Sequence, residues 1–202
     1  MTASAARLEF LALVDDRIMR AVSGLLQDGS GDLTFRRLSQ AAGVPERTLF
    51  RYYPTKAELM AAFWKWMNAR IEVPEQPSSP TELVEQIPEL FAAFEADERL
   101  VRAMLHDPNG REVRLAHAPE RRKRLRVALE DLLSDLEPGL QEKLLASVQI
   151  LASAAGWESM KDNWNLTSDQ AASAAGWAVG ALLGAAGGRG SPREHKRPER
   201  RA

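Results

Sequence analysis

The sequence predicts an all-α protein in which a small N-terminal helix-turn-helix unit precedes a larger helical body. Apolar residues recur three and four positions apart, as in Ile18, Val22, Leu25 and Leu26, and no stretch shows the two-residue alternation of a β-strand. At 202 residues, of which 45% are hydrophobic, the chain can bury a core in one large or two small domains.

Capping patterns mark three of the expected helix starts. A hydroxyl side chain that can accept from free backbone N–H groups is followed three positions later by Glu or Gln. The pairs are Thr55 with Glu58, Ser79 with Glu82, and Thr167 with Gln170. The expected helices cover residues 16–28, 35–42, 45–53, 55–70, 80–95, 97–106, 118–136, 139–163 and 168–186. Residues 5–14 can extend the first helix, and residues 107–119 are expected to form a polar loop.

The proline-rich stretch 73–80 predicts the main division of the chain. Residues 1–70 are expected to form the helix-turn-helix domain, whose last helix, 55–70, links it to the rest. Residues 71–188 are expected to form a larger helical body. Residues 189–202 are too polar to pack and are predicted to be a disordered basic tail.

A tight helix-turn-helix is expected between residues 35 and 53. Gly43 can adopt the left-handed backbone conformation that ends the first helix, and Pro45 opens the second. The buried seam between the two helices is expected to consist of Leu38, Ala41, Val44 and Leu49.

Positive charge gathers around this turn. Residues 34–70 contain seven basic and two acidic residues, although the whole chain has a net charge of −1. The outer face of the second helix is expected to present Glu46, Arg47, Thr48 and Arg51. Arg47 or Arg51 can bind guanine O6 and N7, Glu46 can accept from cytosine N4, and the Thr48 methyl group can contact thymine in the DNA major groove.

Further polar groups are placed to hold phosphates. Tyr52 and Lys56 follow the second helix, and Thr34 and Arg36 stand at the start of the first, where free backbone amides favour an anion. Exposed arginines are often only solvated. The turn, the spacing and the local charge together favour a DNA-binding surface.

The stretch TFRRLSQAAGVPERTLFRYYPTKAEL, residues 34–59, carries a family resemblance. Residues 17–59 resemble the DNA-binding domain of the tetracycline-repressor (TetR) family of bacterial transcriptional regulators. The matching positions are Thr34, Leu38, Ala42-Gly43-Val44, Thr48-Leu49, Phe50, Tyr52, Tyr53 and Lys56. The resemblance implies an all-helical homodimer with an N-terminal DNA-binding head and a C-terminal body, residues 71–188, that binds a small-molecule effector and dimerises.

Two positions depart from the family pattern. Phe50 stands where the family often has tyrosine, so a hydroxyl contact to phosphate is lost and Tyr52 and Lys56 carry more of the contact. Pro45 stands where a capping serine is common, which removes one side-chain phosphate contact.

Small residues recur at every fourth position near the end of the chain, at Ala172, Gly176, Gly180, Gly184 and Gly188. Such a stripe lets another helix approach closely. We therefore expect helices 139–163 and 168–186 to form a two-fold dimer interface. The alternative is that the stripe packs inside one subunit.

By the resemblance, an effector cavity would be lined by Phe91, Phe94, Met104 and Trp157, with Leu105 and Met160 beside them. Such a cavity favours an apolar or aromatic ligand. The alternative is that these residues are ordinary core. His106 and His117 lack a carboxylate at metal-ligand spacing, so neither a metal nor another cofactor is predicted.

Residues 170–188 carry no charge, so a membrane anchor has to be weighed. Only Val179, Leu182 and Leu183 strongly favour insertion, and the glycines oppose it. The GAAGGRG stretch, residues 184–190, follows a helix and is interpreted as a helix stop and linker, not a dinucleotide site. The N-terminus lacks the pattern of a signal peptide and the chain has no cysteine, so a cytoplasmic location is expected.

The sequence therefore predicts a cytoplasmic transcriptional regulator, and a repressor is the expected type. It would bind a palindromic operator as a homodimer and be released by a small-molecule effector. An enzyme is not expected, because the chain has no Cys, no HExxH or GxSxG motif and only three His. The alternative is a protein that sequesters a small molecule, or a scaffold, on the same fold without specific DNA binding.

Overall fold

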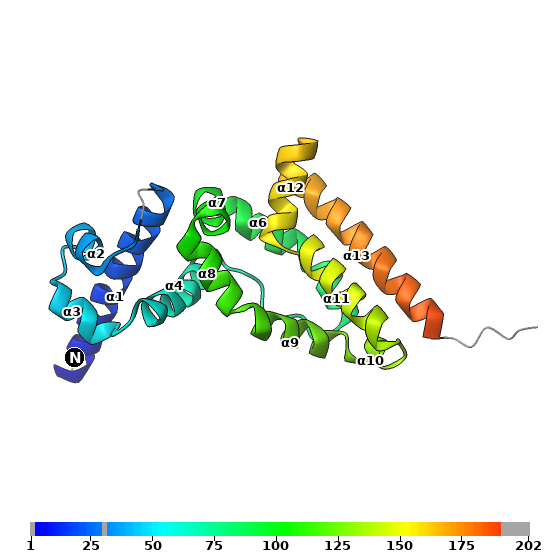
Figure 1. The fold of residues 1–202 in the computed structure, drawn as a ribbon, viewed down its shortest axis with the longest axis horizontal. Helices are drawn as coiled ribbons and strands as arrows, with labels where there is room; N and C mark the ends of the chain where they lie inside the picture. The colour runs from blue at the N-terminus through cyan, green and yellow to red at the C-terminus, as the bar shows by residue number, and fades with distance from the viewer. Residues whose placement is uncertain (1–2, 30–31, 191–202) are drawn as a thin grey trace, which may run out of the picture. The chain divides into compact units, whose positions relative to one another are not determined.

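A computed structural model describes residues 3–29 and 32–190, and all regular secondary structure in these two ranges is helical (Figure 1). The all-α prediction is confirmed. The N-terminal helices are α1 (Ala3–Gln27), α2 (Phe35–Ala42), α3 (Glu46–Tyr52) and α4 (Lys56–Arg70). The next are α5 (Pro80–Glu85), α6 (Ile87–Ala96), α7 (Glu98–His106), α8 (Pro108–Ala116) and α9 (Ala118–Ala128). The last are α10 (Glu130–Ser134), α11 (Pro138–Leu151), α12 (Ala154–Trp164) and α13 (Ser168–Gly190).

The three predicted caps are all present. The Thr55 hydroxyl oxygen accepts from the Glu58 amide at 3.2 Å, and the Thr55 amide donates to the Glu58 carboxylate at 2.9 Å. The equivalent amide-to-hydroxyl distances are 3.2 Å at Ser79 and 3.3 Å at Thr167. These local bonds fix where α4, α5 and α13 begin.

The prediction of a polar loop over residues 107–119 is wrong, because α8 occupies most of it. The Asp107 carboxylate caps this helix by accepting from the Asn109 amide at 2.8 Å, and Pro108 stands at its first turn. Gly110 then lies directly against the backbone of α7. Because this packing joins two helices across a sharp turn, the polar composition alone did not reveal it.

We predict that replacing Gly110 with alanine lowers the free energy of unfolding. An added Cβ would lie 2.6 Å from the Met104 carbonyl oxygen and 2.7 Å from its Cα, so the backbone must shift. The expected loss is about 1–3 kcal/mol, measured by urea unfolding. Gly24→Ala is the control, because nothing lies within 4 Å of its Cβ position in α1. That change should stabilise the protein by about 0.4–1 kcal/mol, and equal losses in both variants would contradict the packing argument.

Three predicted long helices are each broken into two. The range 80–95 breaks at Gln86, two residues before Pro88. Proline has no backbone N–H, so it interrupts the hydrogen bonds of a continuous helix. The range 118–136 breaks at Leu129, whose side chain is fully buried. The range 139–163 breaks at Ala152, and Ser153 caps the next helix by accepting from the Gly156 amide at 3.2 Å. By contrast, residues 5–14 extend the first helix as predicted.

Contacts group the described residues into two compact units, the first from residues 3–29, 32–75 and 89–121 and the second from residues 76–88 and 122–190. This grouping differs from a division at residue 70, because α7 packs on α1 and α8 packs on α4. The first unit has a continuous apolar core. Its fully buried members come from α1, α2, α3, α4 and α7, and they include Ile18, Leu38, Leu49, Phe63 and Leu100.

In the second unit, α13 packs on α5, α10, α11 and α12. Its inner face is buried and consists of Ala171, Ala172, Ala175, Val179, Leu183 and Ala186. The interpretation of residues 184–190 as a helix stop is wrong, because α13 continues through Gly190. Packing explains the continuation, since Leu132 of α10 lies 3.5 Å from the Cβ position of Gly187. Of the predicted tail, residues 191–202 lie outside the described ranges.

Residues Ser168–Gly188 of α13 are long and apolar enough to cross a membrane, and 33% of the most apolar window there is buried inside the chain. The glycines of α13 differ from its buried inner face in their surroundings. Added Cβ atoms at Gly176, Gly180, Gly184 and Gly188 would meet no atom of the described residues within 4 Å, whereas Ala172 is buried. The glycine part of the stripe therefore does not pack inside one subunit within those residues.

Candidate nucleic-acid interface

The turn between α2 and α3 has the predicted backbone geometry. Gly43 has φ 60° and ψ 35°, which is the left-handed region, and its amide donates to the Ser39 carbonyl. Val44 donates to the same carbonyl at 3.2 Å. A side chain would be strained here, and its Cβ would lie 2.6 Å from an Arg17 guanidinium nitrogen. Gly43 thus sets the angle at which α3 leaves α2.

Pro45 is the N-cap of α3 and not its first helical residue. The helix therefore begins one position later than predicted. The Pro45 ψ of 141° is extended, so the helical conformation begins at Glu46. The Pro45 carbonyl accepts from the Thr48 and Leu49 amides at 2.8 and 3.1 Å. Proline supplies no side-chain cap, but its carbonyl starts the helix.

The seam under the two helices differs from the prediction at one position. Leu38, Val44 and Leu49 are buried as expected, whereas Ala41 is exposed and Ala42 is buried in its place. Four residues advance an α-helix by about 400°, so Ala42 lies about 40° from Leu38, while Ala41 lies about 60° away on the other side. The Ala42 side of α2 faces the apolar core of the first unit.

The outer face of α3 presents the four predicted base-reading residues. Glu46, Arg47 and Arg51 are exposed, and Thr48 is half-buried. Leu49, between them in sequence, is fully buried and holds the helix to the core. No residue within 3–29 or 32–190 forms an ion pair with Arg47 or Arg51. Both guanidinium groups are therefore available to an external acceptor.

The predicted phosphate-binding residues lie at the start of α2, at the end of α3 and at the start of α4. Tyr52 and Lys56 are half-buried, and the Arg51 guanidinium carbon lies 5.6 Å from the centroid of the Tyr52 ring. Arg36 is exposed at the first turn of α2. The Thr34 hydroxyl oxygen caps that helix by accepting from the Arg37 amide at 3.3 Å, so its O–H proton can still be donated to a phosphate.

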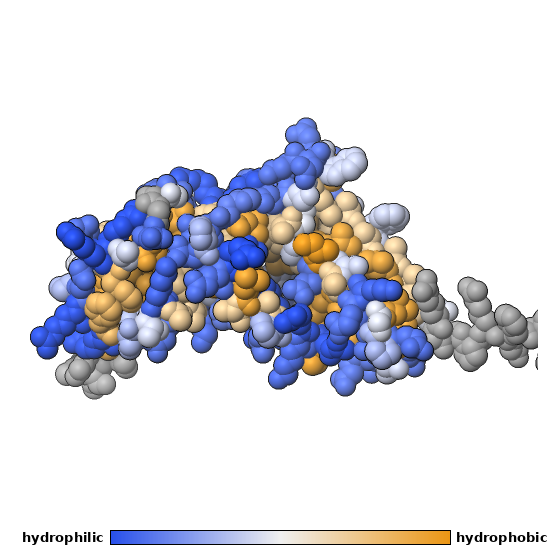
Figure 2. All heavy atoms as spheres, in the orientation of Figure 1, coloured by the Kyte–Doolittle hydropathy of each residue, from blue (hydrophilic) through white to orange (hydrophobic). Residues whose placement is uncertain are grey.

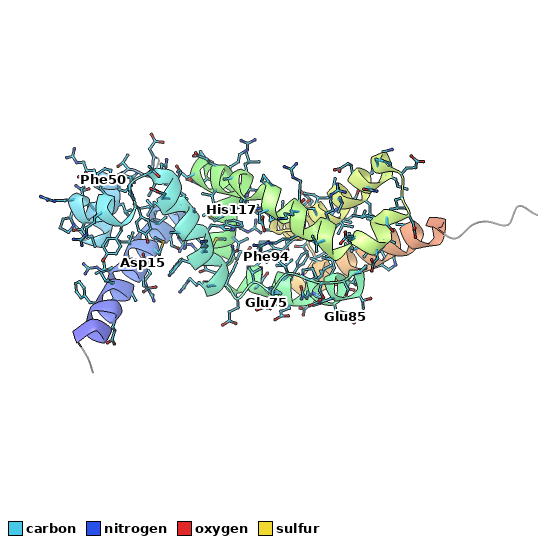
Figure 3. The ribbon with its side chains drawn as sticks, turned by 90° about the horizontal axis from the view of Figure 1, so that it is seen from below. Asp15, Phe50, Glu75, Glu85, Phe94 and His117 are labelled. Carbon is cyan, nitrogen blue, oxygen red and sulfur yellow. The ribbon has the colours of Figure 1, made fainter. Side chains whose placement is uncertain are left out.

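An exposed aromatic pair was not predicted from the sequence. The rings of Phe35 and Phe50 stack with centroids 4.3 Å apart and an interplanar angle of 23°. Phe50 remains 47% exposed at the outer end of the head, where Figure 3 labels it. The stack joins α2 to α3 directly. Phenylalanine at position 50 therefore has a packing role in addition to lacking the hydroxyl group.

Tyr53 holds the end of α3 against α1 and does not lie on the outer face of α3. Its side chain is buried and donates a hydrogen bond to the Asp15 carboxylate of α1. Burial first, and then the Asp15 carboxylate, raise the pKa of Tyr53, so the phenol stays protonated. Trp66 of α4 donates to neighbouring Asp16 at 3.0 Å. These bonds tie the end of α3 and the middle of α4 to α1.

The predicted effector-lining residues are all core residues. Phe91 and Phe94 are buried with ring centroids 6.1 Å apart, and Met104 belongs to the apolar core of the first unit. Trp157 is fully buried in the second unit, where its indole N–H donates to the Ser168 hydroxyl at 3.3 Å. The structure thus pairs the two phenylalanines.

An open groove of about 490 Å³ on the first unit is lined by the end of α1 and by α7. Its lining includes Leu26, Gln27, Arg99, Arg102, Ala103 and His106, and none of the four predicted effector residues. His117 stacks on Trp64 with ring centroids 5.3 Å apart. Within residues 3–29 and 32–190, no cluster of three His, Cys, Asp or Glu side chains is arranged to hold a metal ion.

Residues 20–63 match the family model described as "Bacterial regulatory proteins, tetR family". The matched range runs from within α1 to within α4 and contains every residue from Thr34 to Lys56 discussed above. Neither a curated protein nor a solved structure matches the chain.

Proposed function

From the match of residues 20–63 to the tetR family of bacterial regulatory proteins, we propose that the chain is a repressor. Members of this family are DNA-binding regulators of transcription. The chain binds a palindromic operator as a homodimer and leaves it when a small molecule binds. The observation that supports this is the pair of exposed arginines on α3, Arg47 and Arg51, neither in an ion pair with the described residues. The matched domain and its exposed face also speak against an enzyme.

The proposed DNA contacts divide into two groups. Glu46, Arg47, Thr48 and Arg51 of α3 meet base edges in the major groove. Thr34, Arg36, Tyr52 and Lys56 hold the phosphates on either side and set the register. Two such heads in a dimer contact half-sites about 34 Å apart, one helical turn of DNA, or a multiple of that distance.

We propose that helices α11, α12 and α13 form the dimer interface. Trp164 and Trp177 are 76% and 78% exposed, and Ile150 is 56% exposed, which is unusual for such large apolar side chains. The open glycine positions of α13 lie on the same helix as Trp177. Figure 2 shows apolar residues along α13 on the face drawn. A second copy of these helices can bury this surface.

Trp177→Glu is expected to raise the dimer dissociation constant at least about 30-fold, which corresponds to about 2 kcal/mol for a buried tryptophan anchor. Analytical ultracentrifugation over a concentration series measures this shift. Leu115→Glu is the control, since Leu115 is 54% exposed on α8 of the other unit. A dimer that tolerates Trp177→Glu as well as Leu115→Glu would place the interface elsewhere.

Release requires that the effector bind the two states of the protein with different affinity. We propose an apolar or aromatic effector that binds in the first unit near the paired rings of Phe91 and Phe94, with Met104 as a further candidate residue of that unit. Trp157 is a separate candidate in the second unit. The effector favours a conformation in which the two α3 helices no longer match successive half-sites. The protein is proposed to act in the cytoplasm, without a metal, a cofactor or a membrane.

Selection of bound duplexes from a random DNA pool tests the proposal. The expected result is a two-fold symmetric site that binds far more tightly than its scrambled version at the same salt concentration. Weak, salt-sensitive binding without a preferred sequence would instead favour the alternative, a small-molecule-sequestering or scaffold protein on the same fold.

A further inference from the structure

Arg121 of α9 has a buried nitrogen with no hydrogen-bond partner. Its Nη2 donates to the Arg114 carbonyl at 2.9 Å, whereas its Nη1 has no partner anywhere in residues 3–29 and 32–190. Buried polar groups in folded proteins are almost always hydrogen-bonded, and a buried charge is normally paired. An unsatisfied guanidinium nitrogen therefore indicates a position where an external acceptor would be strongly favoured.

The surroundings of Arg121 add positive charge. Arg114 donates through Nε to the Met104 carbonyl at 2.9 Å and through Nη2 to the Leu105 carbonyl at 3.0 Å. Burial first, and then the charge of Arg114, lower the pKa of Arg121. The Arg114 guanidinium thus adds positive charge near Arg121, whose own Nη2 donates to a neutral carbonyl oxygen. An oxyanion would offset the charge of Arg121 and satisfy its Nη1.

Aromatic rings border the same position. The Arg121 guanidinium carbon lies 5.6 Å from the centroid of the Trp64 ring, and Trp64 stacks on His117 with an interplanar angle of 13°. Figure 3 labels His117 beside α4 and α8. Trp64 and His117 are both partly exposed, so this position lies close to the protein surface. The combination suits a ring that carries a negatively charged group.

We propose that Arg121 binds the carboxylate or phosphate group of a small molecule at the contact between α4 and α8, and that this binding regulates attachment to DNA. Trp64 lies on α4, which continues without a break from Lys56 at the DNA-binding head to Arg70. A ligand that repositions Trp64 therefore acts on the helix that carries the head. The regulatory part rests on the proposed function, whereas the binding part does not.

The binding test uses the full chain and measures its melting temperature in phosphate, benzoate, benzamide and chloride at equal ionic strength. Phosphate or benzoate is expected to raise Tm by about 2–4 °C over chloride, as for a ligand at several times its Kd. Benzamide, which has the ring without the charge, should give no rise. Equal Tm in phosphate, benzoate and chloride would overturn the proposal.

Arg121→Met should abolish the anion-dependent rise. Arg122→Met is the matched control, because Arg122 is the next residue on the same helix and is exposed; this variant should keep the rise. If Arg121→Met does not fold, Arg121→Gln replaces it, because glutamine keeps the polarity and loses the charge. A rise that persists without Arg121 identifies binding elsewhere and would also overturn the proposal.

The regulatory part is tested with the selected operator. Saturating benzoate should change the operator affinity severalfold in the wild type and in Arg122→Met, and not in Arg121→Met. Unchanged affinity with benzoate bound would overturn the regulatory part. If selection yields no operator, the proposed function fails, but the melting experiment still decides whether Arg121 binds an anion, because it uses no DNA.

Discussion

Replacing both Arg47 and Arg51 with alanine should lower the affinity for the selected operator by about 30-fold to 25,000-fold. Each guanidinium can form a bidentate contact to guanine that contributes about 1–3 kcal/mol, and both lie exposed on α3 without an ion pair to the described residues. Affinity for scrambled DNA should fall much less. The ratio of the two affinities, measured by titration at fixed salt, is the quantity that reports base reading.

Lys56→Ala provides the comparison for this variant. Lys56 begins α4 beside the recognition helix, where an ammonium group can neutralise a phosphate but cannot read sequence. Its loss should weaken operator and scrambled DNA about equally and reduce the salt dependence of binding. If the double arginine variant behaves in the same way as Lys56→Ala, the two arginines contact phosphates and the assignment of base reading is wrong.

Phe63→Ala is expected to cost about 3–5 kcal/mol of the free energy of unfolding. Phe63 is fully buried in α4, its ring centroid lies 5.8 Å from that of Trp66, and it belongs to the core that α1, α2, α3, α4 and α7 share. Because a domain is stable by only about 5–15 kcal/mol, such a loss would leave little folded protein at moderate urea concentrations.

Urea unfolding with both far-ultraviolet circular dichroism and tryptophan fluorescence measures this loss as a lower midpoint at unchanged slope. Phe10→Ala is the control, because Phe10 is 64% exposed on α1 and its removal should change stability by no more than about 0.5 kcal/mol. Equal midpoints for Phe63→Ala and the wild type would mean that the shared core contributes little to stability.

The DNA-binding head was largely predictable because its signals are local. A glycine that adopts a left-handed conformation, a capping box at Thr55 and apolar residues at helical spacing each act within a few residues of the chain. The same holds for the exposed arginines, since once α3 is placed, the burial of Leu49 leaves Arg47 and Arg51 facing outward. A short segment contained all of this information.

Elements that depend on packing were predicted less well. The helix α8 was missed because its stability includes the contact of Gly110 with the α7 backbone, which composition does not show. The continuation of α13 through residues 184–190 is accompanied by packing on α10, and the exchange of Ala41 for Ala42 depends on which side of α2 the core helices cover. In each case the deciding partner lies on another helix.

The sequence by itself determined the helical class, the caps, the turn at Gly43 and the charged residues of α3, because these follow from hydrogen bonds and spacing along the chain. Only the tertiary structure decided that Phe35 stacks on Phe50, that Tyr53 is held by Asp15, and that a nitrogen of Arg121 is buried without a partner. Such contacts join residues from different helices. Their energy depends on how the helices pack, and packing acts between segments far apart in the sequence.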